Sequence, residues 1–316
     1  MALKDDPVAA ARMPVCAVVV TYEPRVDALQ GVRALAPQVD HLVVVDNGSG
    51  AASEAYFAGL PVQAQVLRLG DNLGVGAGHN AGIARARELG ARYVLLMDQD
   101  SVPESDMVER LVEGDERLRG EGCRVGAVGP VYFDQRVGKS WPFYRLEGFG
   151  VRGHECGDAP QVACDFLISS GTLVRLDVLD EVGPMPEGYF LEHVDTEWCL
   201  RARHRGYELF GICAARMLHA LGDDAVDVPL IGRRVQVYRP YRHYYLFRNA
   251  VLLARERHAP IRWCVHEALR LAKRFAFFGL FVPPRLPRIG WMLKGAWHGL
   301  RGLEGRIDRP AAQRRL

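Results

Sequence analysis

The sequence predicts an α/β fold with a mostly parallel sheet in its first half, a more mixed second half and a helical C-terminal tail. Three observations support this prediction: β-branched runs recur in the first hundred residues, helix-like stretches separate them, and the alternation changes from about residue 125. The chain has 316 residues, of which 49% are hydrophobic and 25% charged, so it is long enough to bury a sizeable core.

The first half contains runs with the composition of buried strands. They are VCAVVVTY at 15 to 22, the start of HLVVVDNGSG at 41 to 50, VQAQVLRL at 62 to 69, and YVLLM at 93 to 97. The loop GDNLGVGAGHN and a helix over AGIARAREL, residues 81 to 89, are expected between the last two. Right-handed crossovers place such strands in an open twisted sheet whose ligands bind at the carboxyl ends. Asp46, Asn72, Asp98 and Asp100 follow strands and are expected to gather at one edge.

The second half has a different pattern. VGAVGPVYFD at 125 to 134 predicts a short strand, residues 136 to 160 are expected to be irregular, and 164 to 183 read as strand, tight turn and helix. Further helices are expected over 193 to 207 and 239 to 257. The first of these carries acids in its first turn and basic residues towards its end, which suits the helix dipole.

Composition and charge exclude several classes of protein. A net charge of +2 and a pI near 8.2 do not indicate a nucleic-acid binder. The seven cysteines are scattered without a C-x-x-C pair, which fits neither a disulfide framework nor a zinc site and predicts a reducing environment. The N-terminus carries acids where a signal peptide is basic, and no apolar run approaches the roughly 18 residues of a spanning helix. A cytoplasmic location is therefore expected.

The stretch YVLLMDQDS places Asp98 and Asp100 in a loop directly after a buried strand. Two carboxylates this close repel each other, and a hard divalent cation relieves that repulsion. Mg²⁺ or Mn²⁺ typically binds one or two protein carboxylates and completes its coordination with water and phosphate oxygens. The alternative is a solvated loop in which an Asp and a Ser cap the following helix.

The glycine-rich loop offers a second alternative, because Gly76, Gly78 and Ala81 satisfy the G-x-G-x-x-A dinucleotide pattern, with Asp98 about twenty residues later. The true fingerprint, however, follows the first strand of its sheet immediately. Here two strands precede the loop, and residues 70 to 73 intervene. A dehydrogenase would also have no use for Asp100, so NAD binding is disfavoured.

Taken together, VVVTYEP, VVVDNGS, DNLGVGAGHNAGI and LLMDQDS, in this order and spacing, resemble family 2 glycosyltransferases of the GT-A fold. The resemblance continues through FLISSGTLV, YFLEHVDTEWCLRA and RHYYLFRN, and is strongest to rhamnosyltransferases of the O-antigen or rhamnolipid type. It implies a GT-A domain over 13–255, with a Rossmann-like nucleotide-binding half and a mixed acceptor half. A helical, basic and apolar segment follows over 256–316.

The resemblance implies an inverting, metal-dependent enzyme with Mg²⁺ or Mn²⁺ as cofactor. It would move L-rhamnose from dTDP-L-rhamnose to a hydroxyl of a glycolipid or lipid-linked saccharide. The alternatives are a different nucleotide sugar or a catalytically silent nucleotide-sugar-binding scaffold, since a fold does not guarantee activity. Asp195 favours an enzyme, because a scaffold needs no base at that position.

Residue by residue, the resemblance assigns Asp46 to the pyrimidine N3–H and Asp100 to a metal that bridges the two phosphates. Asp98 would bind ribose or the same metal. His219 falls where many family members have a histidine near the metal or the diphosphate, so it is an implied metal ligand. The implied nucleotide and donor residues are Thr21, Tyr22, Glu23, Asp46, Asn72, Gly74, Asn80, Asp98, Gln99, Arg242, Tyr245 and Arg248. The last three are spaced by three residues on one helix and therefore share a face.

Asp195 in VDTEWCLR aligns with the catalytic base of the family, which removes the proton of the acceptor hydroxyl. The commoner family wording has Glu directly before this Asp, whereas this chain has Val194. Glu192 and Glu197 therefore remain alternatives for the base, and Glu197 or Asp195 serving only as a helix cap or as a partner of Arg201 is the structural alternative.

The tail interleaves Phe, Leu and Trp with basic residues, namely Lys273, Arg274, Arg285, Arg288, Lys294 and Arg301. Basic residues beside bulky apolar ones suit a segment that lies at the surface of an anionic membrane. The cytoplasmic face of the inner membrane is then the expected location. The alternative is a helical lid packed on the catalytic domain or on a second subunit of a homo-oligomer.

Overall fold

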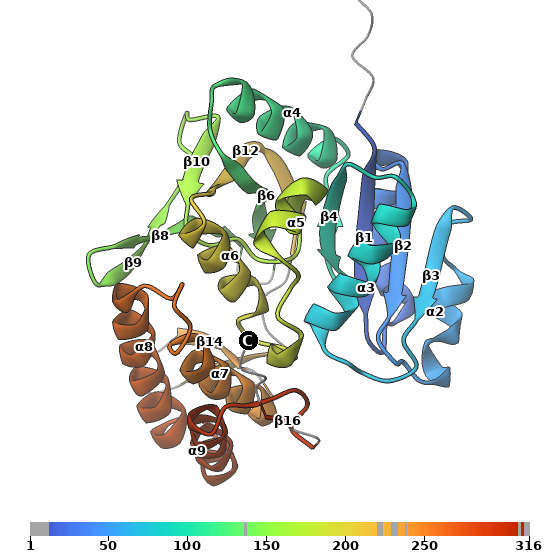
Figure 1. Ribbon diagram of the computed structural model, residues 1–316. Helices are drawn as coiled ribbons and strands as arrows, with labels where there is room; N and C mark the ends of the chain where they lie inside the picture. Colours follow the sequence, from blue (N-terminus) through green and yellow to red (C-terminus); the bar gives the residue numbers. More distant parts are fainter. Residues whose placement is uncertain are drawn as a thin grey trace, which may run out of the picture.

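The computed structural model describes residues 13–135, 138–219, 224–228, 233–237, 239–308 and 311–312. Its centre is a ten-stranded sheet with the order β10-β12-β6-β11-β4-β1-β2-β3, to which β5 and β7 add at β12 and β6. Helices pack on this sheet, and three C-terminal helices, α7 to α9, gather on the opposite side of the molecule from β1 to β3 (Figure 1). The predicted mixed α/β fold with a helical C-terminal part is confirmed.

The first half is parallel, as expected. β1 pairs with both β2 and β4, and β2 pairs with β3, all in parallel register. The strands are β1 (Val15–Thr21), β2 (His41–Asp46), β3 (Ala64–Arg68) and β4 (Tyr93–Asp98). The connecting helices are α1 (Leu29–Leu35), α2 (Glu54–Ala58) and α3 (Val75–Glu88), with short 3₁₀ turns at Val26–Ala28, Ala36–Gln38 and Ala51–Ser53.

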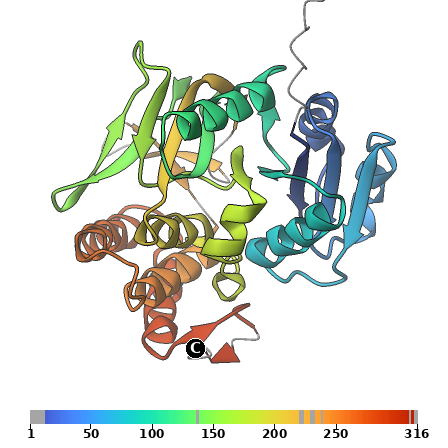
Figure 2. The same ribbon diagram turned by 45° about the horizontal axis from the view of Figure 1, so that its top comes forward.

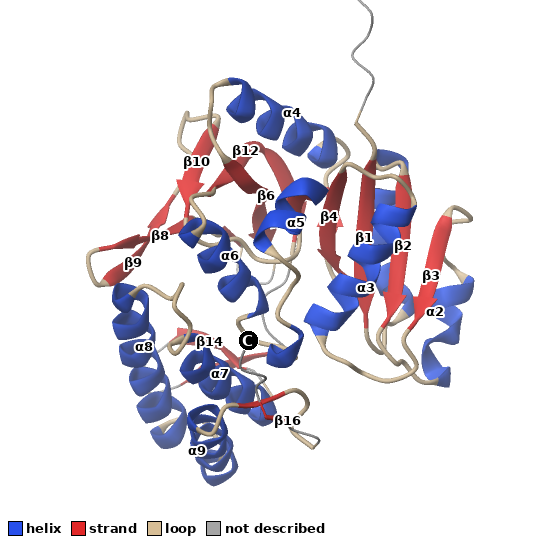
Figure 3. Ribbon diagram, viewed as in Figure 1, coloured by secondary structure: helices blue, strands red, loops and turns tan. Residues whose placement is uncertain are grey.

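Both faces of β1 are buried, which explains its continuous apolar sequence. Cys16, Val18 and Val20 belong to one hydrophobic cluster, and the alternating residues Val15, Ala17 and Val19 belong to the cluster on the other face. Helix α3 lies over β1 and β2 in the first cluster (Figure 3). The two-sided cover holds the carboxyl end of β1 in a fixed position.

Helix α3 begins at Val75, six residues earlier than the sequence predicts, so the glycine-rich stretch is helical. Glycine is needed there because the helix lies very close to β1. A Cβ atom built on Gly78 would lie 2.7 Å from a methyl group of Val20, and one on Gly82 would lie 2.1 Å from a methyl group of Val18. These glycines therefore serve helix-to-strand packing.

The second half of the sheet is mixed, as predicted. β11 is antiparallel to β4 and β6, β12 is parallel to β6, and β10 is antiparallel to β12. The strands are β5 (Val102–Pro103), β6 (Val125–Asp134), β10 (Gln161–Cys164), β11 (Thr172–Arg175) and β12 (Glu208–Leu218). The helices are α4 (Met107–Gly120), α5 (Leu176–Val182) and α6 (Val194–His204), with a 3₁₀ turn at Glu187–Tyr189. Two further strands, β13 (Asp224–Val228) and β14 (Arg233–Val237), pair with each other.

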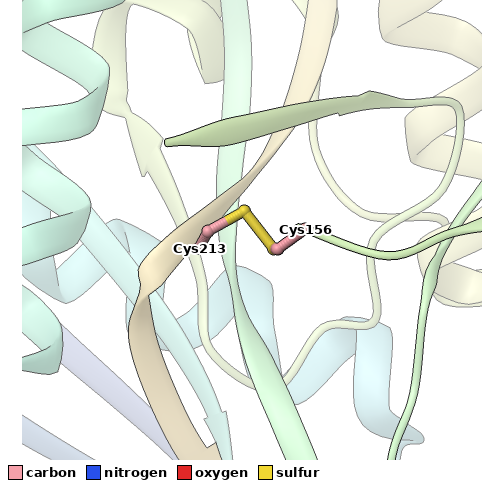
Figure 4. Close-up of a disulfide and its surroundings, with 2 residues drawn as sticks. All are labelled: Cys156 and Cys213. Carbon is pink, nitrogen blue, oxygen red and sulfur yellow. A yellow bond between two sulfur atoms is a disulfide. The ribbon is translucent and has the colours of Figure 1, made fainter. Parts of the chain in front are cut away.

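Two expectations for this half were wrong. The stretch 136 to 160 contains β7 (Lys139–Ser140) and a hairpin of β8 (Phe143–Glu147) and β9 (Gly150–His154). In addition, Cys156 and Cys213 form a disulfide that ties the loop after β9 to β12 (Figure 4). The two cysteines are 57 residues apart, so their pairing depends on the tertiary fold and not on a spacing pattern.

The C-terminal helices are α7 (Pro240–Leu253), α8 (Ile261–Leu280) and α9 (Arg285–Leu300), and α9 packs along α7. The chain then returns through β15 (Leu303–Glu304), which pairs with β16 (Ala311–Ala312). Here Arg306 forms an ion pair of 3.0 Å with Asp71 in the loop after β3. Among the described residues, no helix combines the length and apolar character that crossing a bilayer requires.

Candidate functional site

The carboxyl ends of the central strands bring the predicted acids together. Thr21 is the register partner of Asp46 across β1 and β2, and Val20 is the partner of Asp98 across β1 and β4. Asp46 and Asp98 therefore flank the end of β1 on its two sides. This is the sheet edge at which the sequence places the site.

Asp46 is buried, with 3% of its surface exposed, yet its carboxylate has partners. One oxygen accepts a hydrogen bond of 2.9 Å from the backbone N–H of Ser49, and the other lies 3.4 Å from the guanidinium of Arg68. Thr21 beside it is also buried and donates its hydroxyl proton to the carbonyl of Val45. Asp46 is thus a fixed acceptor at the strand end, while Thr21 supports the backbone there.

The turn after β1 connects the loops of three strands. Glu23 has a positive φ of 49°, and its N–H donates to the Ser49 hydroxyl at 2.9 Å. The N–H of Tyr22 donates to the side chain of Gln99 at 2.8 Å. A cavity of about 380 Å³ opens beside these residues and is lined by Glu23, Gln99 and Asp100 among others. The predicted residues Glu23 and Gln99 therefore border one space, and the backbone of Tyr22 is hydrogen-bonded to Gln99.

Asn72 and Gly74 shape the entry to α3. The Asn72 side chain accepts hydrogen bonds from the N–H of Gly74 at 3.1 Å and from the amide of Asn47 at 3.2 Å. Asn47, whose own oxygen accepts from Leu73, follows Asp46 directly. Gly74 has a φ of 93°, and a Cβ there would lie 2.6 Å from the carbonyl of Phe190. These residues fix the loop beside Asp46.

Asp98, Asp100 and His219 form a group with the chemistry of a metal site. One oxygen of each carboxylate and one ring nitrogen lie within 4.8 Å of one another. His219 follows β12, and its Nδ1 lies 3.6 Å from the Asp100 carboxylate. Two hard oxygen ligands and an imidazole suit Mg²⁺ or Mn²⁺. The residues present therefore fit such an ion.

Two serines that the sequence analysis did not identify support this group. Ser101 lies 2.7 Å from His219 Nδ1 and 2.6 Å from the hydroxyl of Ser170, and Ser170 accepts from the N–H of Asp98 at 3.2 Å. Burial raises the pKa of Asp98 to about 6, against the opposing influence of His219, and the nearby carboxylates of Asp100 and Asp195 raise it further. A cation bound at this position would favour the ionised form of Asp98 and so offset the effect of its burial.

Asp195 lies in the first turn of α6, at the meeting point of two cavities. One has a volume of about 120 Å³, contains Ser170 and is lined mainly by apolar and aromatic side chains. The other has about 200 Å³ and is lined mainly by charged and polar side chains, three of which are arginines. Burial raises the pKa of Asp195, opposed by the hydrogen bond of 2.7 Å from the Thr196 N–H. A carboxylate so placed can accept a proton from a hydroxyl in either cavity.

Each of the two alternative acids has a basic side chain as its partner. Glu197 is buried and held by Arg201 at 2.8 Å and by His258 at 3.0 Å. Glu192 accepts a hydrogen bond of 2.7 Å from Arg242. Glu197 therefore stabilises the junction between α6 and the segment before α8, whereas Asp195 lines both cavities.

Arg248 and Tyr245 do not lie with the predicted donor residues, which corrects the expectation from their shared helix face. Arg248 is fully buried, and its guanidinium donates to the carbonyls of Gly188, Tyr189 and Gly305. Tyr245 is buried too, and its hydroxyl accepts from the N–H of Ile307. Both residues hold backbone segments together and are not available to clamp a phosphate.

Asn80 likewise has a packing role in the structure. Its side-chain amide exchanges hydrogen bonds with the backbone of Met185 at 2.9 and 3.0 Å and donates to Glu187 at 2.8 Å. These contacts tie α3 to the segment before α6. The direct donor contact that the resemblance implies for Asn80 is therefore not supported by its position.

Comparisons with known proteins agree with this geometry. The family model described as glycosyl transferase family 2 matches residues 16–183. The chain is 30% identical over 297 residues to dTDP-rhamnosyl transferase RfbF of Shigella flexneri, covering 92% of this chain and 96% of that protein. It is 28% identical over 298 residues to galactofuranosyltransferase GlfT1 of Mycolicibacterium smegmatis (strain ATCC 700084 / mc(2)155), covering 87% and 96% respectively.

Among solved structures, GalNAc-T7 with UDP, GalNAc and Mn²⁺ resembles the chain with a TM-score of 0.57 at 10% sequence identity. The match covers 91% of this chain and 56% of that one, and at this identity it concerns the fold. Sequence and fold thus point to the same conclusion. The chain belongs to glycosyl transferase family 2 and is a glycosyltransferase with a GT-A-like fold.

Proposed function

We propose that the protein is an inverting, metal-dependent rhamnosyltransferase. Its donor is dTDP-L-rhamnose, and its acceptor is a hydroxyl of a glycolipid or a lipid-linked saccharide. One observation supports this proposal most: Asp195 and Ser170 line one cavity, and Ser170 hydrogen-bonds to the backbone of Asp98 in the candidate metal group. A base and a diphosphate-binding group therefore border the same space, as transfer from a nucleotide sugar requires.

In this proposal, Asp98, Asp100 and His219 hold the cation, and Ser101 and Ser170 orient them. A bound Mg²⁺ or Mn²⁺ would neutralise the negative charge that develops on the leaving diphosphate. Manganese in the GalNAc-T7 structure supports a divalent metal for this fold. The donor set of two carboxylates and an imidazole supports it independently.

Asp46 is the proposed acceptor for the pyrimidine N3–H, because it is fixed and buried at the end of β2. Thymine and uracil both present this N–H, so Asp46 does not distinguish between them. The preference for dTDP-L-rhamnose rests on the likeness to RfbF, a dTDP-rhamnosyl transferase, while the GlfT1 relatives are galactofuranosyltransferases. The donor sugar is therefore the first property to measure.

Asp195 is the proposed general base. It takes the proton of the acceptor hydroxyl while that oxygen attacks the anomeric carbon from the face opposite the leaving diphosphate. The C–O bond to the diphosphate breaks as the new glycosidic bond forms, so the configuration at the anomeric carbon inverts. The cavities on both sides of Asp195 provide room for donor and acceptor sugars to meet at its carboxylate.

The acceptor is proposed to be presented at a membrane surface. Helix α9 exposes an apolar stripe of Leu286, Leu293, Trp297 and Leu300, spaced by three to seven residues. Exposed basic residues accompany it, namely Lys273, Arg285, Lys294 and Arg301, and Glu267, the one acid within residues 261 to 303, is buried. Apolar contact flanked by positive charge suits anionic lipid. Arg288 is an exception to the expected pattern, because it is buried against His243.

Calorimetric titration of dTDP and dTDP-rhamnose tests the donor assignment, with UDP, UDP-glucose and NAD as comparisons, each with Mg²⁺ and with chelator. We expect binding of the dTDP ligands that chelator abolishes. Asp100→Ala should weaken this binding at least tenfold. Asp106→Ala should leave it unchanged, because Asp106 is a partly exposed acid at the N-cap of α4 that pairs with Arg110.

If Asp100→Ala bound dTDP with the parental affinity in Mg²⁺, the metal assignment would be wrong. If no pyrimidine diphosphate bound with metal, the chain would be a scaffold that keeps the fold without its chemistry. If UDP-sugars bound in preference to dTDP-sugars, dTDP-L-rhamnose would be the wrong donor, and the proposal of a glycosyltransferase would still stand.

A further inference from the structure

The cavity of about 120 Å³ on one side of Asp195 has an apolar wall, which is unusual for a place where a sugar is expected. The largest apolar side chains that line it are those of Phe143, Phe166, Leu167 and Ile168, and two tyrosines, Tyr132 and Tyr144, also line it. Sites for whole ligands typically have about 300 to 1,000 Å³. This cavity therefore receives part of a substrate and not all of it.

Two glycines in neighbouring strands let the apolar wall pack tightly on the sheet. A Cβ atom on Gly211 in β12 would lie 2.1 Å from a ring carbon of Phe143. A Cβ atom on Gly129 in β6 would lie 2.8 Å from a methyl group of Leu167. Phe143 and Leu167 are both buried, so they are held against these strands. The wall is therefore a fixed part of the fold.

The hydroxyl groups of Ser and Thr in the lining already have partners within the protein. Thr172 donates its hydroxyl proton to the carbonyl of Ile168 at 2.6 Å. The hydroxyl of Thr196 donates to the Asp195 carboxylate at 3.3 Å. Ser170 is hydrogen-bonded within the candidate metal group. A substrate group that enters beside these residues therefore meets mainly apolar surface.

The position of the cavity indicates which part of the substrates it receives. Ser170 connects it to the candidate metal group, which is proposed to hold the diphosphate, and Asp195 is proposed to take the proton of the acceptor hydroxyl. The transferred sugar is bonded to the diphosphate through the carbon that this hydroxyl attacks. It must therefore lie between the metal group and Asp195, where the apolar wall borders it.

We propose that this cavity selects a donor sugar without a hydroxyl at C6, because its apolar wall receives the C6 methyl group. This inference rests on the proposed transferase function and assigns the choice of donor sugar to Phe143, Leu167 and Ile168. A methyl group gains from burial against apolar side chains. A hydroxymethyl group in the same place would bury a hydroxyl that has given up its hydrogen bonds to water, which is unfavourable.

Two donors that differ by one oxygen atom test this inference. They are dTDP-L-rhamnose and dTDP-L-mannose, since L-mannose is the same sugar with a hydroxyl at C6. Calorimetric titration of the full chain with each donor, in the presence of Mg²⁺, gives the two affinities. We expect dTDP-L-rhamnose to bind about 10 to 100-fold more tightly, the range in which an apolar pocket rejects an added hydroxyl. Equal affinities, or tighter binding of dTDP-L-mannose, would overturn the inference.

Substitutions at Ile168 test the wall itself. Ile168→Thr adds a hydroxyl that can pair with the one at C6, so the preference for dTDP-L-rhamnose should fall about tenfold. Ile168→Val stays apolar and should keep most of the preference, which separates the effect of polarity from that of altered packing. Ile261→Thr is the matched control, because Ile261 is 74% exposed at the start of α8. Its preference should equal that of the parent.

An unchanged preference in Ile168→Thr would show that this wall does not select the sugar. Titration of the same preparations with dTDP and Mg²⁺ separates such a result from the donor assignment. Metal-dependent binding of dTDP, together with equal binding of the two dTDP-sugars, would remove the role of the cavity and leave the transferase function in place. If dTDP itself did not bind, the donor assignment would fail and the inference would fail with it.

Discussion

At the scale of single residues, Asp195 is the side chain with the most direct proposed role. Asp195→Asn keeps the shape of the side chain and removes the base, so kcat should fall about 10² to 10⁴-fold. Affinity for dTDP should change little, because the proposed partner of Asp195 is the acceptor hydroxyl, and dTDP carries no sugar for that hydroxyl to attack. The measurement is kcat for sugar transfer beside calorimetric dTDP binding, with Glu192→Gln as the matched carboxylate-to-amide control.

The pH profile gives a second test of the same residue. A base must be deprotonated, and burial raises the pKa of Asp195 above 3.8, the usual value for an aspartate. The acid limb of kcat/KM should therefore fall at a higher pH than an exposed aspartate would give. A larger loss in Glu192→Gln than in Asp195→Asn would transfer the role of base to Glu192.

Arg248 is predicted to contribute to stability and not to donor binding. Arg248→Met removes the hydrogen bonds that the buried guanidinium donates to the carbonyls of Gly188, Tyr189 and Gly305. A hydrogen bond from a charged donor contributes about 1.5 to 3 kcal/mol, so the free energy of unfolding should drop by more than about 3 kcal/mol. Urea denaturation measures this loss. Unchanged stability together with lost dTDP affinity would restore Arg248 to the donor site.

These residues show how far the sequence alone reaches. Asp46, Asp98 and Asp100 could be predicted because each ends an apolar strand, and strand ends in a parallel sheet share an edge. Ser101 and Ser170 could not be recognised, because their contact joins positions 69 residues apart. Arg248 was misassigned because helical spacing tells which residues share a face and not which segment covers that face.

At the scale of elements, the contact between α8 and the start of α6 positions the catalytic segment. His193 has a positive φ of 65°, which is unfavourable for a residue with a side chain. Its ring lies 3.2 Å from the buried carboxylate of Glu267 and edge-on to Trp263. Burial alone would raise the pKa of Glu267, but His193 and Arg270 outweigh it and hold the pKa low. The contact with Glu267 fixes His193, two residues before Asp195.

Glu267→Gln should therefore lower kcat about tenfold with little change in dTDP affinity, because the segment that carries Asp195 loses its anchor while the nucleotide site is distant. Glu267→Asp, which keeps the charge, should recover part of the activity. The measurement is kcat and KM for transfer alongside the thermal midpoint. Equal loss of activity and of dTDP binding would indicate general unfolding and contradict a positioning role.

The elements also differ in how well sequence predicts them. Strands β1, β2 and β4 are apolar on both faces and were recognisable, whereas β7 to β9 are short and partly exposed. Helix α3 begins earlier than expected because its glycines, which usually disfavour helix, allow close packing on β1. Helix propensity alone therefore predicts the wrong start for α3, because the packing of the helix on β1 determines the conformation of these residues.

At the scale of the whole molecule, α8 and α9 lie on the side of the molecule away from β1 to β3 (Figure 2). We expect the protein to float with vesicles that contain anionic lipid and not with neutral vesicles. Glutamine at Lys273, Arg285, Lys294 and Arg301 should abolish flotation. The control carries glutamine at four exposed arginines elsewhere, namely Arg25, Arg117, Arg152 and Arg205.

Equal flotation of both variants would show that the basic residues of α8 and α9 do not direct membrane binding. Concentration-dependent dimerisation without flotation would instead identify a second copy of the chain as the partner of the apolar stripe. Sedimentation of the parent and of Leu293→Ser distinguishes these outcomes, since the substitution places a polar group in the middle of the stripe.

The ion pair between Arg306 and Asp71 connects the end of the C-terminal helices to the loop that leads to Asn72. In the same segment, the carbonyl of Gly305 accepts a hydrogen bond from Arg248, and the N–H of Gly305 donates to the carbonyl of Gly188. A protease cut between α9 and β15 would therefore loosen the nucleotide loop and the segment before α6 together. The rate of digestion at that point therefore reports whether the segment after α9 holds the nucleotide loop and the segment before α6 in place.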